Sequence, residues 1–271
     1  MHFEKYKDIA LATAEEAGRL LLDRQGRTQI HFKGETNLVT EADLESERLC
    51  QDRLLGAFPG TDYLGEEGAA RRSGSEFMWV VDPIDGTNNY AHGIPIFSVS
   101  IGLRYQGEVI LGVVHAPAMQ ETYIAAKGAG ATLNNEPIRV SDIRELRKSI
   151  LATGFPYDKR ENPQNNLDHF ANLTLEAQGI RRYGCASIDL CWVAAGRFDG
   201  YWEMRLGSWD VDAGSLVVRE AGGLVTDFAG GPATDPPAHI LASNGWIHEQ
   251  MKEVLGVLSS GSRPDFSIRR K

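Results

Sequence analysis

One segment of the sequence constrains the fold more than any other: an apolar run that leads directly into two aspartates. Residues 77–81 read Phe-Met-Trp-Val-Val, a composition typical of a buried β-strand. Asp82 and Asp85 follow, separated by a proline and Ile84, and Gly86 comes next. Carboxylates at a strand end are the hard oxygen ligands that Mg²⁺ requires, and the Ile84 carbonyl could add another. The segment predicts a buried strand, and its two acids are compatible with a metal site at the strand end.

The same residues also have an interpretation without metal. An Asp-Gly pair is a common β-turn signal, and Asp82 could be a surface acid beside that turn. In the metal interpretation, Pro83 fixes the turn and Gly86 allows a ligand to approach closely. Thr87 would then begin a helical turn whose free N–H groups face a phosphate. The rest of the chain has to decide between the two.

Three further acids stand next to predicted elements. Glu66 follows the short strand-like stretch 62–64, and Asp210 lies in the first turn of an apolar helix pattern. Asp43 comes three residues after Thr40, at the start of another helix pattern. Each acid alone has an ordinary explanation, namely a solvated loop, a complement to the helix dipole and a capping box.

Helical patterns precede the strand patterns along the chain. Residues 4–24 and 40–58 carry apolar side chains at helical spacing, with a polar turn at 33–37 between them. Two helices are therefore expected before any convincing strand. An antiparallel sheet is expected next, from strands at 77–81, 96–103, 109–114 and 121–126 and a turn at 133–136.

From about Ser149 strands and helices alternate. The expected strands are a short one that ends at 153 and four more at 180–183, 200–204, 224–227 and 240–242. The expected helices cover 166–177, 187–195, 211–221 and 246–258. An α+β half followed by an α/β half implies alternating layers of helix and sheet. We predict one compact catalytic unit with halves 1–148 and 149–260 and a loose tail at 261–271.

Charge and cysteine content narrow the possible functions. The 271 residues include 37 acids and 28 Lys and Arg, a net charge of −9, which disfavours direct binding to nucleic acid or an anionic membrane. A phosphorylated substrate requires bound cations that reverse the local field. Three cysteines without metal spacing, and no signal-peptide or membrane-spanning run, predict a cytoplasmic protein with reduced thiols.

Taken together and in this order, the acidic motifs resemble those of the inositol monophosphatase family. They are Gly-Glu-Glu at 65–67, Asp-Pro-Ile-Asp-Gly-Thr at 82–87 and Trp-Asp-Val-Asp-Ala-Gly at 209–214. The resemblance runs from about Lys33 to Gly223, most of the chain. It implies a five-layer αβαβα sandwich of the inositol monophosphatase and fructose-1,6-bisphosphatase type, usually a homodimer.

The resemblance also implies a metal site and a mechanism. The matching magnesium ligands, for two or three ions per site, are Glu66, Asp82, the Ile84 carbonyl, Asp85 and Asp210. Glu66 and Thr87 match the residues that activate the attacking water, and Asp43 matches the acid bonded to the threonine hydroxyl. Water would attack a small polyol phosphate directly, with cations on both the attacking and leaving oxygens. Inhibition by lithium is implied as well.

Substrate contacts follow from the same resemblance. Gly184, Cys185 and Ala186 match a turn whose backbone meets sugar hydroxyls, and Glu203 matches the acid that accepts hydrogen bonds from them. Glu203 has an alternative interpretation as a surface acid at a strand edge. The other implied contacts are Asp85, Gly86, Thr87 and Asp210.

Two departures from the family pattern leave more than one alcohol possible as the leaving group of the reaction. Cys185 stands where serine or threonine is common, and Leu206-Gly207-Ser208 stands where many bacterial relatives carry a basic residue and proline. The same chemistry on histidinol phosphate, a fructose bisphosphate or a nucleotide 3′-phosphate is an alternative, because only the pocket would differ. Some bacterial members are partners of the transcription machinery, which is a non-enzymatic alternative. Cys191, in an apolar run, is expected in the core.

Overall fold

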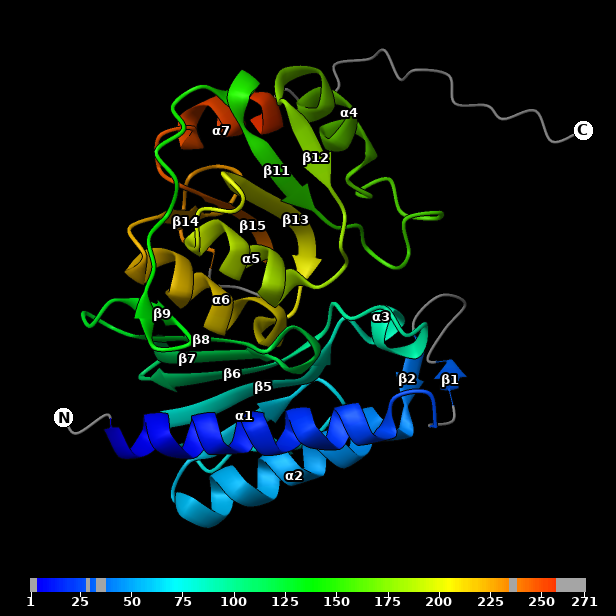
Figure 1. The fold of residues 1–271 in the computed structure, drawn as a ribbon, viewed down its shortest axis with the longest axis vertical. Helices are drawn as coiled ribbons and strands as arrows, with labels where there is room; N and C mark the ends of the chain where they lie inside the picture. Colours follow the sequence, from blue (N-terminus) through cyan, green and yellow to red (C-terminus); the bar gives the residue numbers. More distant parts are fainter. Residues whose placement is uncertain (1–3, 28–29, 33–37, 234–237, 257–271) are drawn as a thin grey trace, which may run out of the picture.

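Two helices packed side by side form one outer layer of the molecule (Figure 1). The computed structural model describes residues 4–27, 30–32, 38–233 and 238–256, so the turn predicted at 33–37 and the tail predicted at 261–271 lie outside the described residues. α1 (Glu4–Arg24) has the predicted bounds. α2 (Glu41–Ala57) begins after Thr40, whose backbone N–H donates to Asp43 Oδ2 at 2.7 Å, as expected for a capping box.

A short antiparallel pair of strands lies between these helices in the chain. They are β1 (Ile30–Phe32) and β2 (Leu38–Thr40). The prediction that two helices precede the first strand is therefore wrong. Strands of three residues are too short to display a period of two, so the hydrophobic pattern could not reveal them.

The first sheet has eight strands in the order β10-β9-β8-β7-β6-β5-β3-β4. They are β3 (Asp62–Gly65), β4 (Ala70–Arg71), β5 (Phe77–Asp85), β6 (Ser98–Tyr105), β7 (Glu108–Ala116), β8 (Glu121–Ala126), β9 (Ala131–Leu133) and β10 (Glu136–Pro137). The sheet is antiparallel, as predicted, except that β3 and β5 run parallel. The carboxyl ends of β3 and β5 therefore lie at the same edge of the sheet.

The end of β5 differs from the predicted turn at Pro83. The strand continues to Asp85, with an irregular register against β6 between Asp82 and Asp85. A bulge is one of the few places where a strand tolerates a proline, which has no N–H to donate. α3 (Thr87–Ala91) begins after Gly86, which has a φ of 90° that suits glycine. Both aspartates thus stay at the strand end, followed by the expected helical turn.

A pair of helices covers the other face of this sheet and separates it from a second one (Figure 1). They are α5 (Ala186–Ala194) and α6 (Ser208–Glu220). The second sheet has the order β12-β11-β13-β15-β14, with β11 (Ile150–Thr153), β12 (Gly179–Arg181), β13 (Gly200–Leu206), β14 (Leu224–Thr226) and β15 (Ala238–Ser243). Outside it lie α4 (Leu167–Glu176) and α7 (His248–Gly256).

Two glycines allow α6 to lie directly on the first sheet. Gly102 of β6 is paired with Gly112 of β7. A Cβ on Gly112 would lie 2.7 Å from the Ala213 carbonyl oxygen, and one on Gly102 would lie 3.1 Å from Asp212 Cβ. Backbone atoms cannot yield as side chains do, so the close contact requires glycine at position 112.

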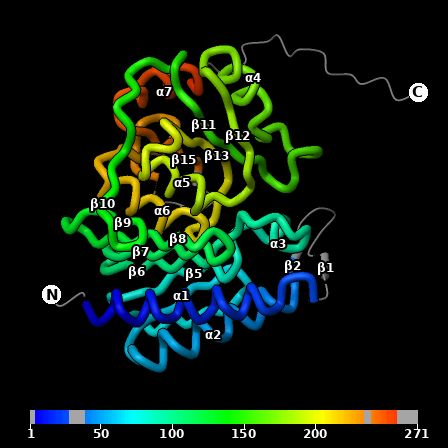
Figure 2. The backbone as a smooth tube through the Cα atoms, in the orientation of Figure 1, coloured from blue at the N-terminus to red at the C-terminus, as the bar shows by residue number. Residues whose placement is uncertain are grey.

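The elements stack as helix, sheet, helix, sheet, helix, which confirms the predicted five-layer αβαβα sandwich (Figure 1). The backbone trace shows the connection after β10 passing along one side of the molecule from the first sheet to the second (Figure 2). Cys191 is buried in the core between the sheets, as predicted.

Candidate metal and active site

A cavity opens where the carboxyl ends of β3 and β5 meet the N-terminal ends of α5 and α6. Its volume is about 360 Å³. The predicted site residues that line it are Glu66, Asp82, Ile84, Asp85, Gly86, Thr87, Gly184, Ala186, Glu203 and Asp210. These residues come from both sheets and from segments more than a hundred positions apart, so the fold brings the predicted positions together.

The most concentrated charge in the cavity comes from aspartates. Asp82, Asp85 and Asp210 each present a carboxylate oxygen, and these oxygens all lie within 4.8 Å of one another. Glu66 lines the same cavity, and its carboxylate is the neighbouring charge that most raises the pKa of Asp82.

Local structure fixes each aspartate in place. Asp85 accepts hydrogen bonds from the Ser187 N–H at 2.6 Å and the Ala186 N–H at 3.3 Å, in the first turn of α5. Free N–H groups at a helix start favour a carboxylate, so Asp85 joins the two halves of the chain. Asp210 Oδ2 accepts from the Gly207 N–H at 2.6 Å, and Asp82 Oδ1 accepts from the Ile84 N–H at 3.0 Å.

Burial and mutual repulsion disfavour the ionised form of the clustered carboxylates, and a bound cation would offset both effects. Burial raises the pKa of Asp82 well above its ordinary value, and neighbouring carboxylates, Glu66 first, raise it further. Burial and the same neighbour also raise the pKa of Asp210. Burial raises the pKa of Asp85 as well, although its bonds to α5 oppose the shift. An all-oxygen set of converging carboxylates is the donor chemistry that Mg²⁺ and similar hard cations require.

Thr87 stands beside this cluster, next to Asp43. Its Oγ1 lies 3.1 Å from Asp43 Oδ1 and 3.0 Å from the Ile84 carbonyl oxygen, and its one hydroxyl hydrogen can serve either acceptor. Asp43 also accepts from the Thr40 hydroxyl at 2.7 Å. Burial raises the pKa of Asp43 to about 6, against the effect of these hydrogen bonds. The carboxyl of Asp43 thus lies outside the cavity wall, within hydrogen-bond distance of the Thr87 hydroxyl.

The opposite wall carries Glu203. Its Oε2 accepts a hydrogen bond from the Tyr201 hydroxyl at 2.5 Å. Burial raises the pKa of Glu203 to about 7, although Tyr201 and Arg182 oppose the shift. The alternative of a solvated strand-edge acid does not fit this position, because Glu203 faces the cavity.

Only two of the three residues of the predicted turn at 184–186 line the cavity. Gly184 and Ala186 line the cavity, whereas Cys185 is only 1% exposed and does not. The Cys185 thiol instead lies 3.4 Å from the Asp85 carbonyl oxygen. Burial raises the pKa of this thiol well above its ordinary value, so it is not a thiolate nucleophile.

Sequence reasoning missed several residues of the cavity wall. Tyr157 and Asp158 reach it from the loop after β11, and Arg205 from the end of β13. Arg182, next to the predicted turn, also lines it. A Phe-Pro-Tyr sequence in a polar loop signals only a turn, and the register that turns Arg205 toward the loop is not visible in a sequence pattern.

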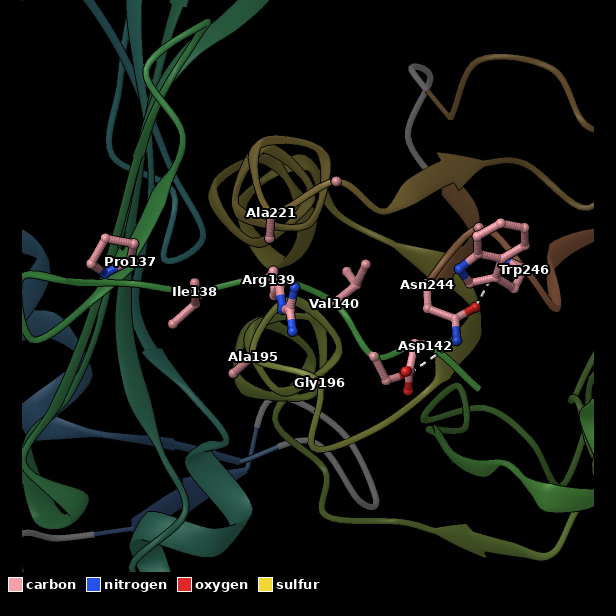
Figure 3. Close-up of a pocket in the computed structure, with 13 residues that line it drawn as sticks. Pro137, Ile138, Arg139, Val140, Asp142, Ala195, Gly196, Ala221, Asn244 and Trp246 are labelled. Atoms are coloured by element: carbon pink, nitrogen blue, oxygen red, sulfur yellow. Dashed lines mark hydrogen bonds between the residues drawn. The ribbon is translucent and has the colours of Figure 1, made fainter. Parts of the chain in front are cut away.

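A second cavity, of about 1020 Å³, lies on the side where the chain passes between the sheets (Figure 3). Figure 3 shows Ile138 and Val140 on that connection, which runs between Ala221 on one side and Ala195 on the other. Asp142 is the one acid among its lining residues. A single carboxylate cannot bind a divalent cation as the clustered carboxylates of the first cavity could. The first cavity is therefore the candidate site.

The five layers and the acidic cavity together define an α/β sandwich with a candidate site for divalent cations between its sheets. The chain belongs to the inositol monophosphatase family, whose sequence model matches residues 3–258. The resemblance of the acidic motifs is thus confirmed. Among the residues that the structure describes, no helix has the length and apolar character needed to cross a membrane.

Individual relatives agree with this assignment. A Nus factor SuhB of Pseudomonas aeruginosa is 42% identical and covers 88% of this chain and 90% of its own. An inositol-1-monophosphatase of Synechocystis is also 42% identical and covers 93% of this chain and 89% of its own. The solved structure of an Anabaena inositol monophosphatase superposes with a TM-score of 0.87 at 42% identity, over 94% of this chain and 97% of its own.

Proposed function

We propose that this protein is a magnesium-dependent phosphatase that hydrolyses the phosphate monoester of a small polyol. The observation that carries the proposal is the convergence of three aspartate carboxylates within 4.8 Å in a cavity that Glu66 and Glu203 also line. Relatives named inositol-1-monophosphatase support the same reaction. The cavity of about 360 Å³ has room for a phosphate and a small ring.

The cation ligands in this proposal are Glu66, Asp82, the Ile84 carbonyl, Asp85 and Asp210. Bound magnesium ions would offset the phosphate charge and supply an activated water, for direct attack on phosphorus. Glu66, on the cation side of the cavity, accepts a proton from that water. The Thr87 hydroxyl, oriented by Asp43, fixes the position of the same water.

Phosphate and polyol contacts are assigned to different parts of the wall. Free N–H groups at Gly86 and Thr87, where α3 begins, face the phosphate. The backbone of Gly184 and Ala186 and the carboxylate of Glu203 receive the polyol hydroxyls. Cys185, whose side chain is buried and which does not line the cavity, is left out of these contacts. A homodimer and a cytoplasmic location stay predictions.

The test is a panel of phosphate monoesters assayed with magnesium and with a chelator. We expect turnover of inositol monophosphate that disappears on chelation and returns with added magnesium. The panel includes histidinol phosphate, fructose 1,6-bisphosphate and a nucleotide 3′-phosphate, so it also tests these alternatives. Activity that survives chelation would contradict the metal-dependent mechanism.

A second candidate function is a partner of the transcription machinery. The relative named Nus factor SuhB favours it, because it is as similar to this chain as the relatives named for the enzyme. The acidic cavity favours the enzyme. Capture of RNA polymerase factors by a tagged protein, together with no turnover on the whole panel, would support this candidate instead.

A further inference from the structure

The loop between β11 and α4 closes on itself at the mouth of the candidate site. Its two ends meet at Asn166, whose side-chain amide donates to the Gly154 carbonyl oxygen at 2.7 Å and to Thr153 Oγ1 at 2.9 Å. The Asn166 side-chain oxygen accepts from Trp202 Nε1 at 2.8 Å. A loop of about 6–16 residues with adjoining ends is an Ω-loop, and such loops often carry function. We name residues 154–166 the Ω-loop; it lies on the same side of the molecule as α3 (Figure 1).

The Ω-loop is ordered by its own contacts. The N–H groups of Glu161 and Asn162 both donate to the Asp158 carbonyl oxygen at 3.0 Å. Phe155 packs against Phe170 of α4, with ring centroids 5.6 Å apart. The cavity side of the loop therefore has a defined shape and presents consecutive residues, 155–158, to the site.

An ion pair connects the Ω-loop to the strand that carries Glu203. Arg205 Nη1 lies 2.6 Å and 2.7 Å from the two carboxylate oxygens of Asp158, and Asn162 donates to the same carboxylate at 3.2 Å. Arg205 has a φ of 63°, in the left-handed region that non-glycine residues rarely adopt. It lies where the register of β13 shifts, between Glu203 and Leu206. Backbone strain of this kind persists only where surrounding contacts impose it.

The result of this arrangement is the position of Tyr157. The residue is 49% exposed and lines the cavity, so it forms part of the outer wall. Tyr157 lines the cavity together with Glu66 and Asp210. Partial burial of its phenol, and then these two carboxylates, raise the pKa of Tyr157. Tyr157 thus shares the cavity wall with the proposed cation ligands, where the proposed phosphate binds, whereas Glu203 is assigned to the polyol.

We propose that Tyr157 is a substrate-contacting residue that donates a hydrogen bond to the bound phosphate, and that Asp158 and Arg205 are positioning residues that act through it. The inference rests on the proposed function for the identity of the substrate. A neutral phenol is suited to this role, because it donates to an anion without a charge that would compete with the cations.

The test compares Tyr157→Phe with wild type in two measurements. Turnover is measured with magnesium on inositol monophosphate and on p-nitrophenyl phosphate, and binding of inorganic phosphate is measured by calorimetry with magnesium. Loss of one hydrogen bond to an anion should lower kcat/KM about 10-fold or more on both substrates and weaken phosphate binding to a similar degree. The matched control is Glu161→Gln, which removes an exposed charge from the same loop, does not line the cavity, and should change neither.

Asp158→Asn distinguishes positioning from a merely structural role. Asp158→Asn should lower kcat/KM, but by less than Tyr157→Phe does. Added to Tyr157→Phe, it should lower kcat/KM little further, because Asp158 acts through the same phenol. Additive losses would overturn the positioning role. Arg205→Lys, which keeps the charge, should retain more activity than Arg205→Gln.

The binding measurement separates this inference from the proposed function. If wild type hydrolyses none of the phosphate esters but binds phosphate more tightly than Tyr157→Phe, the tyrosine contact stands and the phosphatase assignment fails. If wild type is active and Tyr157→Phe matches it in both turnover and phosphate binding, the contact is wrong. A wild type that neither hydrolyses the esters nor binds phosphate overturns both.

Discussion

A single methyl group at Gly154 should displace Glu203 and so test its assignment. Gly154 is buried directly after β11, and a Cβ there would lie under 3.0 Å from all the atoms of the Glu203 carboxyl group. Its φ is outside the left-handed region, so alanine is compatible with the backbone. The carboxylate is the far end of a flexible side chain and should move away, although the Tyr201 hydroxyl binds it at 2.5 Å.

The size of the effect follows from the bonds that Glu203 would lose. One hydrogen bond from a substrate hydroxyl to a carboxylate contributes about 1.5–3 kcal/mol. Gly154→Ala should therefore lower kcat/KM for a polyol phosphate about 10- to 100-fold. Because p-nitrophenyl phosphate has no hydroxyls for Glu203 to bind, its hydrolysis should change much less. Overpacking should also lower the free energy of unfolding, by about 1–3 kcal/mol if neighbours cannot adjust.

The assay compares both substrates at saturating magnesium, with thermal melts to confirm folding. Gly56→Ala is the matched control, because a Cβ there meets nothing within 4 Å. Glu203→Gln should reproduce the selectivity of Gly154→Ala, by raising KM for the polyol phosphate far more than for p-nitrophenyl phosphate. The double variant should be little worse than either single one. Equal losses on both substrates would refute a specific role for Glu203 in polyol binding.

Two further predictions concern stability. Asp189 is 1% exposed and neither carboxyl oxygen has a hydrogen-bond partner within the described part of the chain. Burial raises its pKa, so the folded protein keeps a proton that the unfolded chain loses above about pH 4, and stability falls as pH rises. The free energy of unfolding of Asp189→Asn, measured by urea titration, should therefore rise relative to that of wild type between pH 4.5 and pH 8. A difference between the two proteins that stays the same over this pH range would contradict the argument. Gly112→Ala should lower the free energy of unfolding by about 1–3 kcal/mol, because its Cβ would lie 2.7 Å from the Ala213 carbonyl oxygen; an unchanged melting temperature would show that α6 can move.

The sequence predicted the elements that have a strong period or a strong motif. The helix at 4–24 has a regular apolar spacing and was predicted with its observed bounds. The strand entering Asp82 is an uninterrupted apolar run, which is typical of a buried strand. The β1–β2 pair has too few residues to show a period, and the proline before Ile84 suggested a turn where the strand continues through a bulge.

The hydrophobic pattern of the sequence could not predict the contacts between segments that lie far apart in the chain. The parallel pairing of β3 and β5, which brings Glu66 to Asp82, is a choice of neighbour that neither strand encodes by itself. The bonds from the first turn of α5 to Asp85 join residues 101 and 102 positions apart. Tyr157 escaped prediction for a similar reason, because its place depends on the Ω-loop and on the ion pair of Asp158. Glu66, Asp82, Asp85 and Asp210, which their order and the family resemblance had singled out, nevertheless line one cavity.

The most direct test of the account is a magnesium titration of activity in wild type and three variants that remain folded by circular dichroism. Glu66→Gln should lower kcat about 10²-fold or more even at saturating magnesium, because Glu66 also positions and activates the attacking water. Asp85→Asn and Asp210→Asn should chiefly raise the magnesium concentration needed for half activity, and excess metal should recover part of the rate. Full rescue of Glu66→Gln by magnesium, or wild-type titration curves for Asp85→Asn and Asp210→Asn, would contradict the assigned roles.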